Sequence, residues 1–492
     1  MSAADLHFFS YGYIMTELTQ TPQPQKVELP DTWSGELKAL LWLGIPMALT
    51  QLAQFSIFTI DILMIGRLGP QDLAAASLGT VIYFLLWMLG FGPVMAVSPL
   101  ISQALGADQN DRHSVRVSVR MALWTIVIMC PFMLVLVLMA EPLSLLAGQD
   151  PAQSAKAGGY VLALAAGWPF ALGTMVLRNY LAVIEKIRVP LVLALLTTLI
   201  NAGLNALLIF GLFGFPKLGL VGAGIASSMS YAVGFFMFVI YVNKDKTSAP
   251  FRVFEHLFRP HWDRFRDVVM LGWPISITTV FEGMLFNACV LLIGLIGVME
   301  VAAYQIALNV ATLAFMFPWG FSMAGAIRVG LATGAENHGA VRRAGLVTMV
   351  ASVIGIMVVA IPVALWPHGV ASLYLDTSQP ENQIVIALVA SFLPLAAAFM
   401  FFDAVQVSAN QILRGLKDVR WPMVASGISY WVIGFPVAAY LAFKTPLGAQ
   451  GIWYGLLFGL LSASVFLSYR FWRLAWGQPN PAQESPKSAA KA

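Results

Sequence analysis

Three acidic residues lie inside long apolar stretches of the sequence, and these carboxylates are its clearest candidates for chemistry. Asp61 lies in FTIDILMIGRLG, Glu282 in the segment 267–297, and Asp403 in FMFFDAVQVSANQILRG. A charged side chain in hydrocarbon costs at least about 2.5–3.5 kcal/mol on insertion scales, so such residues usually face a cavity or a partner. Glu282 lies about 15 residues, roughly 22 Å, from either flank of its segment, whereas Asp61 lies only about 6 residues before Arg67.

A carboxylate in such a place has three plausible uses. Removed from water it binds a proton more readily than in solution, so it can load a proton on one side of a membrane and release it on the other. When ionised, it can hold Na⁺ together with amide and hydroxyl oxygens, or it can balance the charge of an organic cation. All three uses fit a cation-coupled transporter. The structural alternatives are an interfacial position or an Arg67 pair for Asp61, and hydrogen bonds between helices for Glu282 and Asp403.

Two asparagines extend this set of polar residues. Asn201 and Asn205, in LINAGLNALLIFG, are four residues apart and therefore share one face of a helix. Two amides facing lipid would be costly, so this face is expected to meet other helices. The pair could form a hydrogen-bond network around Asp61, or it could join helices without any further role, since such bonds contribute only about 0.6 kcal/mol each on average. The residues alone leave both interpretations open.

The composition indicates that helices in a membrane position these residues. Of the 492 residues, 59% are hydrophobic and 11% are charged, against roughly 25% charged in soluble domains. Continuous apolar runs predict an all-α membrane protein, and nothing alternates as the strands of a membrane barrel would. Twelve segments are expected, near 39–66, 73–104, 119–140, 157–184, 190–213, 219–242, 267–297, 301–333, 344–366, 382–413, 421–443 and 449–472.

The distribution of basic residues predicts the orientation of these segments. Most Lys and Arg residues lie in the connections after even-numbered segments, including Arg112, Arg116, Arg188 and Arg342. By the positive-inside rule, these connections and both termini are cytoplasmic. The net charge of +4 is spread over short loops, so it gives no indication of a nucleic-acid partner. We expect an integral, multi-pass protein of the cytoplasmic (inner) membrane, in contact with lipids and acting as a monomer.

The two halves of the chain resemble each other at a constant spacing of 228 residues. LGIPMALTQLAQ, which starts at Leu43, aligns with LGWPISITTVFE, which starts at Leu271. GPVMAVSPLISQALGAD, from Gly92, aligns with GFSMAGAIRVGLATGAE, from Gly320. Six helices in each repeat give both halves the same orientation, so we expect two six-helix bundles related by a pseudo-two-fold axis along the membrane normal.

This repeat divides the chain into five predicted parts. Residues 1–37 form a cytoplasmic N-terminal tail, 38–242 an N-lobe with helices one to six, and 243–266 a cytoplasmic linker. Residues 267–474 form a C-lobe with helices seven to twelve, and 475–492 a disordered C-terminal tail. Pro46 and Pro274 are repeat mates early in helices one and seven. A proline kinks a helix, so each is a candidate hinge, with a fixed packing kink as the alternative.

Two other classes of function fit the sequence less well. An intramembrane enzyme would need a nucleophile–base pair or a metal motif, but the histidines lie in tails, loops or helix ends, and the two cysteines have no ligand spacing. A flippase for lipid-linked precursors would need a basic central cavity for a pyrophosphate. The deep cationic candidates, Arg178, Arg328 and Arg414, all lie near the ends of the predicted helices, so acids dominate the interior.

The sequence resembles multidrug and toxic compound extrusion (MATE) transporters over about residues 36–474. The resemblance is carried by the pattern P-x4-Q-x9-D-x4-G at Pro46, Gln51, Asp61 and Gly66, and by AAYQIALNV, NAGLNALLIFG and FFDAVQVSANQILRGLKD. Acids in the seventh and tenth helices favour the bacterial NorM-like branch. The resemblance implies a secondary multidrug antiporter, not an enzyme, that exports cationic or amphipathic drugs in exchange for Na⁺ or H⁺ by alternating access, with no other cofactor.

The resemblance also assigns expected roles to individual residues. The cation-coupling residues of the N-lobe are Asp61, Asn201, Asn205 and Gln51. The cation or substrate residues of the C-lobe are Glu282, Asp403 and Phe315. The expected metal is limited to Na⁺ at the carboxylates. Two positions depart from the family pattern: Tyr304 stands where many members have histidine, which weakens a proton role there, and Phe399 replaces a tyrosine of some members, which removes one hydroxyl oxygen from a second-lobe Na⁺ site.

Overall fold

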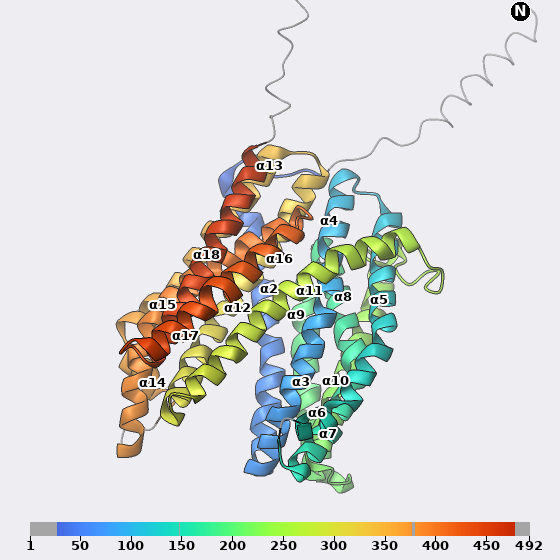
Figure 1. Cartoon of the computed structure of the whole chain (residues 1–492). Coiled ribbons are helices and arrows are strands. Elements are labelled where there is room, and N and C mark those ends of the chain that lie inside the picture. Colours follow the sequence, from blue (N-terminus) through green and yellow to red (C-terminus); the bar gives the residue numbers. More distant parts are fainter. Residues whose placement is uncertain (1–26, 147, 376–378, 478–492) are drawn as a thin grey trace, which may run out of the picture.

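The computed structural model describes residues 27–146, 148–375 and 379–477, and within these ranges it contains helices and no strands. Within this described part of the chain, eleven helices are long and apolar enough to cross a membrane, and the bent pair Pro151–Ala165 and Trp168–Val183 makes a twelfth crossing if it counts as one span. These twelve spans coincide with the twelve predicted segments. The prediction of an all-helical, multi-pass membrane protein is therefore confirmed (Figure 1).

The first six spans form the N-lobe, defined here as helices α2 to α10. In chain order they are α2 (Trp33–Gly66), α3 (Pro70–Met95), α4 (Val97–Ala107), α5 (Arg112–Leu138), α6 (Ala140–Leu146), α7 (Pro151–Ala165), α8 (Trp168–Val183), α9 (Arg188–Phe210), η1 (Leu212–Gly214) and α10 (Gly219–Lys244). Three of these spans are broken, at Ala96, at Met139 and between α7 and α8, where the axis bends by 41°.

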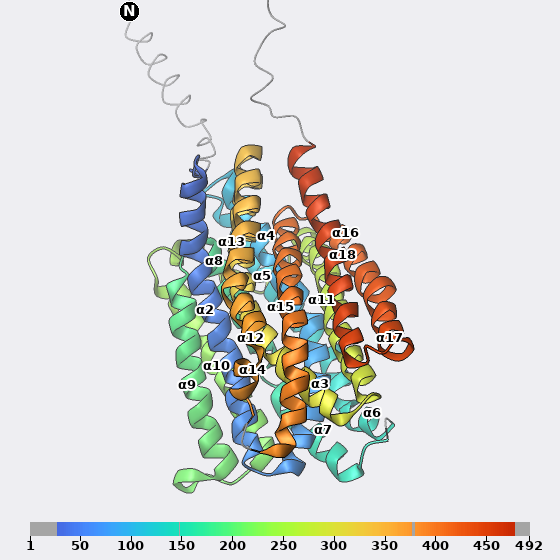
Figure 2. The same cartoon turned by 90° about the vertical axis from the view of Figure 1, so that its left-hand side faces the viewer.

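The last six spans form the C-lobe, defined here as helices α11 to α18. They are α11 (Trp262–Gly294), α12 (Val298–Gly334), α13 (His338–Leu365), α14 (Pro367–Ser372), α15 (Pro380–Gly415), α16 (Arg420–Gly427), the π-helical segment η3 (Ile428–Gly434), α17 (Phe435–Lys444) and α18 (Ala449–Trp476). Figure 2 shows the beginning of α2 and the end of α18 at the same end of the molecule, called here the terminal end.

Helix boundaries differ from the predicted ones mainly at this terminal end. The first helix begins at Trp33 and not near 39, because Thr32 caps it through a bond from the amide of Gly35. Helix α11 begins at Trp262, so part of the predicted linker 243–266 is helical. Polar residues can continue a helix beyond the apolar run that predicts it, and hydropathy alone misses such ends. Most of the predicted tails, 1–37 and 475–492, lies outside the described residues.

The remainder of the linker packs against the first turns of α5. Arg116 donates to the carbonyl of Phe251 at 3.0 Å, and Trp124 donates to the carbonyl of Leu257 at 2.7 Å. Arg116 also forms an ion pair with Glu255 at 2.9 Å. One basic and one aromatic side chain of the N-lobe thus fix the segment that leads into the C-lobe.

The two lobes meet through pairs of contacts that repeat at the 228-residue spacing. A Cβ atom added at Gly44 would lie 2.5 Å from the ring of Phe321, and one added at its repeat mate Gly272 would lie 2.7 Å from Pro93, the mate of Phe321. The contact from the N-lobe glycine to the C-lobe residue has its counterpart from the C-lobe glycine to the N-lobe residue. A two-fold relation between the lobes produces such reciprocal pairs of contacts. Larger residues at either glycine would separate the helices.

A second pair of contacts repeats in the same way. Gly106 packs against Leu331 and its mate Gly334 packs against Gln103, with the added Cβ atom within 2.2 Å of the facing carbonyl in each case. All of these contacts lie in α4 or in the halves of α2, α3, α11 and α12 nearest the terminal end. Figure 1 shows the ribbons of the two lobes farther apart at the opposite end.

One buried ion pair also joins the lobes near the terminal end. Arg328 on α12 donates from Nε and Nη2 to the two carboxylate oxygens of Glu36 on α2, both at 2.8 Å. Glu36 is 1% exposed and Arg328 5%. Removal of one partner from such a pair costs about 3–5 kcal/mol, because the other charge stays buried without compensation. This bidentate contact therefore stabilises the arrangement in which the lobes are closed at the terminal end.

Candidate functional site

Asp61 lies at the centre of a hydrogen-bond network between α2, α9 and α10. Its side chain is 7% exposed. Asn205 donates to Asp61 Oδ1 at 2.5 Å, and the hydroxyl of Ser227 donates to Asp61 Oδ2 at 2.8 Å. Asn201 links the two donors: its Oδ1 accepts from Asn205 at 3.2 Å and its Nδ2 donates to Ser227 at 3.3 Å.

This geometry shows that the asparagine pair joins helices and also bonds to the Asp61 network, so the two interpretations do not exclude each other. The i, i+4 spacing places both amides on the face of α9 that meets α2, and they belong to the network around Asp61. Ser227 completes the network but was not expected from the sequence. It lies in AGIASSMSYAV among other small residues, and no periodic signal separates it from Ser228 or Ser230. Its role follows only from the packing of α10 against α9.

Three tyrosines lie near the same carboxylate, close enough for the charge of Asp61 to act on their hydroxyl groups. They are Tyr83 on α3, Tyr160 on α7 and Tyr231 on α10. Tyr160 is 5% exposed. The polar groups around Asp61 are therefore uncharged. Within the part of the chain that the structure describes, no arginine or lysine lies within ion-pair distance of its carboxylate.

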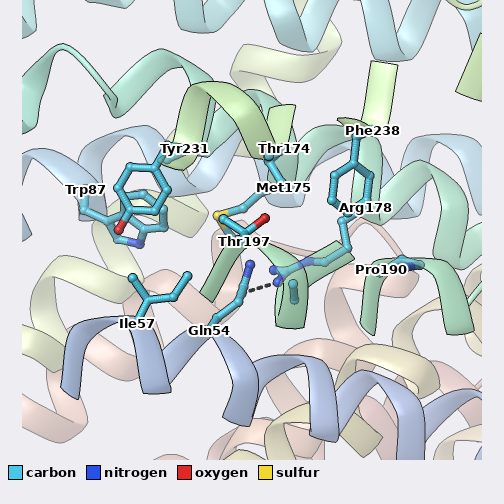
Figure 3. A pocket seen from close by; sticks show the side chains of 13 residues that line it. Gln54, Ile57, Trp87, Thr174, Met175, Arg178, Pro190, Thr197, Tyr231 and Phe238 are labelled. Carbon is cyan, nitrogen blue, oxygen red and sulfur yellow. Dashed lines mark hydrogen bonds between the residues drawn. The ribbon is translucent and has the colours of Figure 1, made fainter. Parts of the chain in front are cut away.

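A cavity of about 130 Å³ opens inside the N-lobe one helical turn from this network (Figure 3). Ile57, Thr197 and Tyr231 line it, and each lies four residues from a member of the network: Asp61, Asn201 and Ser227, respectively. The side of the cavity nearer the terminal end carries Arg178, whose guanidinium donates to Gln54 Oε1 (Figure 3). The described residues that line the cavity do not include Asp61, Asn201, Asn205 or Ser227, so the network lies next to the cavity and not in its wall.

Gln51 is not part of this arrangement. It lies ten residues before Asp61, about 15 Å along the helix and on a different face. Its amide donates to the sulfur of Met323 on α12 at 3.0 Å, so it contacts the C-lobe. The glutamine that lines the cavity is Gln54, three residues after Gln51. The sequence pattern predicts Gln51 as a neighbour of Asp61, but its side chain points toward the C-lobe.

The two acids of the C-lobe lie near each other, between α11 and α15. Asp403 is 7% exposed, and the charge of Glu282 acts on both Asp403 and Arg414. Arg414 is 5% exposed, and its side chain donates to Gln411 Oε1 at 3.4 Å. Among the described residues, neither acid forms an ion pair with Arg414 within 4.0 Å. Neither acid is therefore neutralised by a fixed direct contact.

Many buried polar atoms around Asp403 have no hydrogen-bond partner within the described part of the chain. They belong to five neighbouring side chains of α15 to η3: Asp403 Oδ1, both amide atoms of Gln406, Gln411 Nε2, Arg414 Nε and the hydroxyl of Tyr430. Buried polar groups are nearly always paired, so such a cluster indicates partners that the protein itself does not provide. Carboxylate, amide and hydroxyl oxygens are suitable ligands for a hard cation or for water.

Phe315 lies in an aromatic row at the junction of the lobes. Its ring centroid is 5.6 Å from that of Trp319, and Trp319 is 6.1 Å from Phe91 on α3. The candidate hinges also lie at this junction. Thr50 donates to the carbonyl of Pro46 at 2.7 Å, and its repeat mate Thr278 donates to that of Pro274 at 2.8 Å. In each lobe, a threonine four residues on thus donates to the carbonyl of the proline itself.

The two positions that depart from the family pattern are both buried in the C-lobe. Phe399 contacts Phe286 and Trp453, with ring centroids 5.9 and 5.8 Å away. Tyr304 lies 5.3 Å from the same tryptophan, and its hydroxyl has no partner among the described residues. Phe399 therefore belongs to an aromatic cluster.

The MatE family model matches the chain twice, at residues 46–207 and 274–440. The two matches begin at Pro46 and at Pro274, the same repeat mates that the sequence spacing identified. Together they cover more than half of the chain. The chain belongs to the MATE family. The predicted resemblance is confirmed, and the internal repeat is confirmed with it.

Curated relatives of the MATE family extend over nearly the whole chain. A probable multidrug resistance protein NorM from Rhizobium meliloti (strain 1021) is 40% identical over 93% of this chain and 97% of its own length. A protein of the same name from Mesorhizobium japonicum is 38% identical over 90% of this chain and 94% of its own length. The chain therefore lies on the NorM-like side of the MATE family.

Solved MATE structures share the fold at lower identity. The outward-facing conformation of a multidrug resistance MATE family transporter has a TM-score of 0.79 at 19% identity and covers 92% of this chain and 97% of its own. The eukaryotic MATE transporter AtDTX14 has a TM-score of 0.79 at 21% identity. The match covers 90% of this chain and 98% of that transporter. The family is one of transporters and not of enzymes.

Proposed function

We propose that this MATE protein is a secondary multidrug antiporter, which exports cationic or amphipathic organic compounds in exchange for Na⁺ or H⁺. The observation that carries the proposal is the environment of Asp61. Its buried carboxylate accepts hydrogen bonds from Asn205 and Ser227, both neutral, and it lies beside a cavity. Such a group keeps its charge available for an exchangeable cation. The names of the NorM relatives support the drug class.

Alternating access gives this exchange its direction. The lobes are in contact at the terminal end, through the paired glycine contacts and the Glu36–Arg328 ion pair. A second state, closed at the opposite end, would break these contacts. A ligand shifts the balance only if it binds one state better than the other. We infer that drug and cation prefer different states or compete for Asp61, so that each releases the other.

The orientation is part of the same proposal. We infer that the terminal end faces the cytoplasm across the inner membrane, with both chain termini on that side. The first turns of the helices that begin at this end contain Arg112, Arg116, Arg188 and Arg342, which is the bias expected on the cytoplasmic side. Labelling of single cysteines placed at Ser34 and at Thr445, with a reagent that cannot cross the membrane, checks the orientation.

The experiment that tests the function is transport by the purified chain in liposomes with separately imposed Na⁺ and pH gradients. We expect ethidium movement against its own gradient when one of these gradients is present, and none when both are collapsed. Which gradient is effective identifies the coupling ion. Asp61→Asn serves as the matched negative control, because it removes the charge and keeps the shape. Ethidium accumulation that persists without any ion gradient would contradict the antiport proposal.

A further inference from the structure

A groove at the terminal end runs along α2 and is not part of the proposed export site. It has a volume of about 630 Å³, and its walls are the first turns of α2, from Gly35 to Pro46, and the connection between α8 and α9. Figure 2 shows α2 and α9 next to each other, with the start of α2 beyond the start of α9. The volume lies within the range of about 300–1,000 Å³ that is usual for small-molecule sites.

Three charged side chains line this groove, and all three are exposed. They are Lys38, Arg188 and Glu185, so two positive charges and one negative charge give the groove a net charge of +1. Within the described part of the chain, none of the three forms an ion pair. The guanidinium of Arg188 lies over the ring of Trp42, 4.9 Å from its centroid. Lys38 lies one turn before Trp42 on the same face of α2.

The two basic residues lie where the apolar parts of their helices begin. The apolar runs of α2 and α9 start near residues 39 and 190, directly after Lys38 and Arg188. Trp42, between these charges, is 55% exposed, and tryptophan is enriched at the membrane interface. Deeper in the groove, Ile45 is 48% exposed, and Pro46 lies about 12 Å from Lys38 along the helix axis. The groove is therefore cationic at its outer end and apolar at its inner end.

This order of polarity matches a phospholipid that stands in the membrane leaflet at the terminal end. Acyl chains cover any exposed apolar helix surface at this depth, so the charges add a preference among headgroups. Basic pockets between membrane helices bind anionic headgroups. Glu185 lies in the same groove and disfavours a headgroup with several negative charges. A single phosphate balances the net charge of the groove.

We propose that this groove binds an anionic phospholipid with one phosphate and no amine, the chemistry of phosphatidylglycerol. Lys38 and Arg188 hold the phosphate, and the acyl chains lie along Trp42 and Ile45. The site is separate from the buried carboxylates, so the proposal does not depend on the export function. Each basic residue near a membrane surface increases the affinity for anionic lipid by about five-fold.

Native mass spectrometry of the purified chain tests the preference. The protein in detergent is mixed with equal amounts of phosphatidylglycerol and phosphatidylcholine that have identical acyl chains. We expect Lys38→Gln and Arg188→Gln each to lower the ratio of bound phosphatidylglycerol to bound phosphatidylcholine by about five-fold. Glu185→Gln should raise this ratio, because it removes the negative charge from the same groove. The opposite directions distinguish a site from general damage to the protein.

A matched control separates the groove from the basic surface around it. Lys246, in the connection between α10 and η2, is also exposed and lies outside the groove. Lys246→Gln removes the same charge and should leave the ratio unchanged. Phosphatidylglycerol with a diazirine in its acyl chain gives the location: after irradiation, the label should lie on the part of α2 around Ile45, and Arg188→Gln should reduce it.

Each of the remaining outcomes overturns the proposal. An unchanged ratio in folded Arg188→Gln and Lys38→Gln protein shows that the groove has no headgroup preference. An equal decrease in Lys246→Gln shows an effect of general surface charge. If phosphatidylethanolamine binds better than phosphatidylglycerol and Glu185→Gln removes this difference, the ligand is an amine headgroup. If glycerol phosphate displaces the lipid, the groove binds a soluble phosphate. None of these results affects the proposed export function, because lipid binding is measured without transport.

Discussion

The buried carboxylates of the two lobes differ in whether the protein itself provides their hydrogen-bond donors. In the N-lobe, both oxygens of Asp61 accept bonds from donors that belong to the protein. In the C-lobe, Asp403 Oδ1 and the neighbouring groups of Gln406 and Tyr430 have no partners among the described residues. The lobes share one repeat, yet the equivalent of Asp61 on α11 is Cys289, and the acids occur elsewhere.

This difference suggests different relations to the coupling ion. A carboxylate with its hydrogen bonds in place keeps its geometry when the ion leaves, so release costs little reorganisation. A cluster with unpaired groups depends on a ligand or on water to satisfy them. We therefore expect the N-lobe site to determine exchange and the C-lobe site to require occupancy for its stability. The following predictions test this comparison, from the largest effect to the smallest.

Removal of a carboxylate charge from either lobe is expected to have the largest effect. Asp61→Asn and Glu282→Gln should each reduce ion-driven ethidium efflux to the level of cells without the transporter, because each removes a negative charge that the exchange needs. The two variants should still insert into the membrane. Ethidium efflux from cells that express either variant measures the outcome, with the amount of inserted protein as control. Normal efflux in one variant would remove that lobe from the coupling mechanism.

Loss of the Ser227 hydroxyl should have an intermediate effect. Ser227→Ala removes one of the two bonds to Asp61, so we expect the apparent affinity for the coupling ion to change by about three- to ten-fold, while transport continues. Ser230→Ala is the matched control, because the Ser230 hydroxyl bonds to the carbonyl of Ala226 in its own helix, at 2.7 Å. The dependence of the efflux rate on ion concentration gives the affinity. An equal change in both variants would contradict a specific role of Ser227.

Asp403→Asn should change thermal stability little in the absence of the coupling ion. It should mainly reduce the stabilisation that the ion provides. The variant keeps the size of the side chain but weakens the binding of any cation that fills the cluster. We expect a smaller rise in thermal stability when the coupling ion is added than in the wild type. Thermal unfolding in detergent, measured with and without the ion, checks this expectation. If ion-induced stabilisation is retained in full, the unpaired groups of the C-lobe do not bind the ion.

The smallest effect is expected from a hydroxyl that has no partner. Tyr304→Phe in the C-lobe should change the free energy of unfolding by no more than about 0.5 kcal/mol, because the Tyr304 hydroxyl makes no bond within the described residues. Tyr180→Phe in the N-lobe removes a bond to the carbonyl of Ser248 at 3.1 Å and should cost about 1 kcal/mol. Denaturation of the two variants gives both values. An equal loss in the two variants would contradict the assignment of the Tyr304 hydroxyl as unpaired.

Sequence patterns predicted the twelve spans and the repeat, because both depend on features with long-range regularity. About 20 consecutive apolar residues identify a span whatever its neighbours are, and a constant spacing of 228 residues links Pro46 to Pro274 without any knowledge of packing. The i, i+4 spacing of Asn201 and Asn205 placed them on one face. The spacing of residues within one helix could not show which other helix this face contacts.

Gln51 shows where this reasoning failed. The pattern around Asp61 included Gln51, but a separation of ten residues turns the two side chains to different faces of α2. Gln51 contacts Met323 of the C-lobe, while Gln54 faces the cavity. Phe315 was likewise expected near the cation residues and lies in an aromatic row with Trp319. Rotation about the helix axis, and not position along the chain, determined the contact of Gln51.

The sequence by itself determined which segments enter the membrane, how they repeat and which of their residues are too polar to face lipid, because transfer energies belong to single residues and short windows. Only the tertiary structure decided that Ser227 bonds to Asp61, that Glu36 joins Arg328 and that Arg178 bonds to Gln54. Each of these contacts joins helices that are far apart in the chain, and a pairing of that kind depends on how the helices pack and rotate against one another.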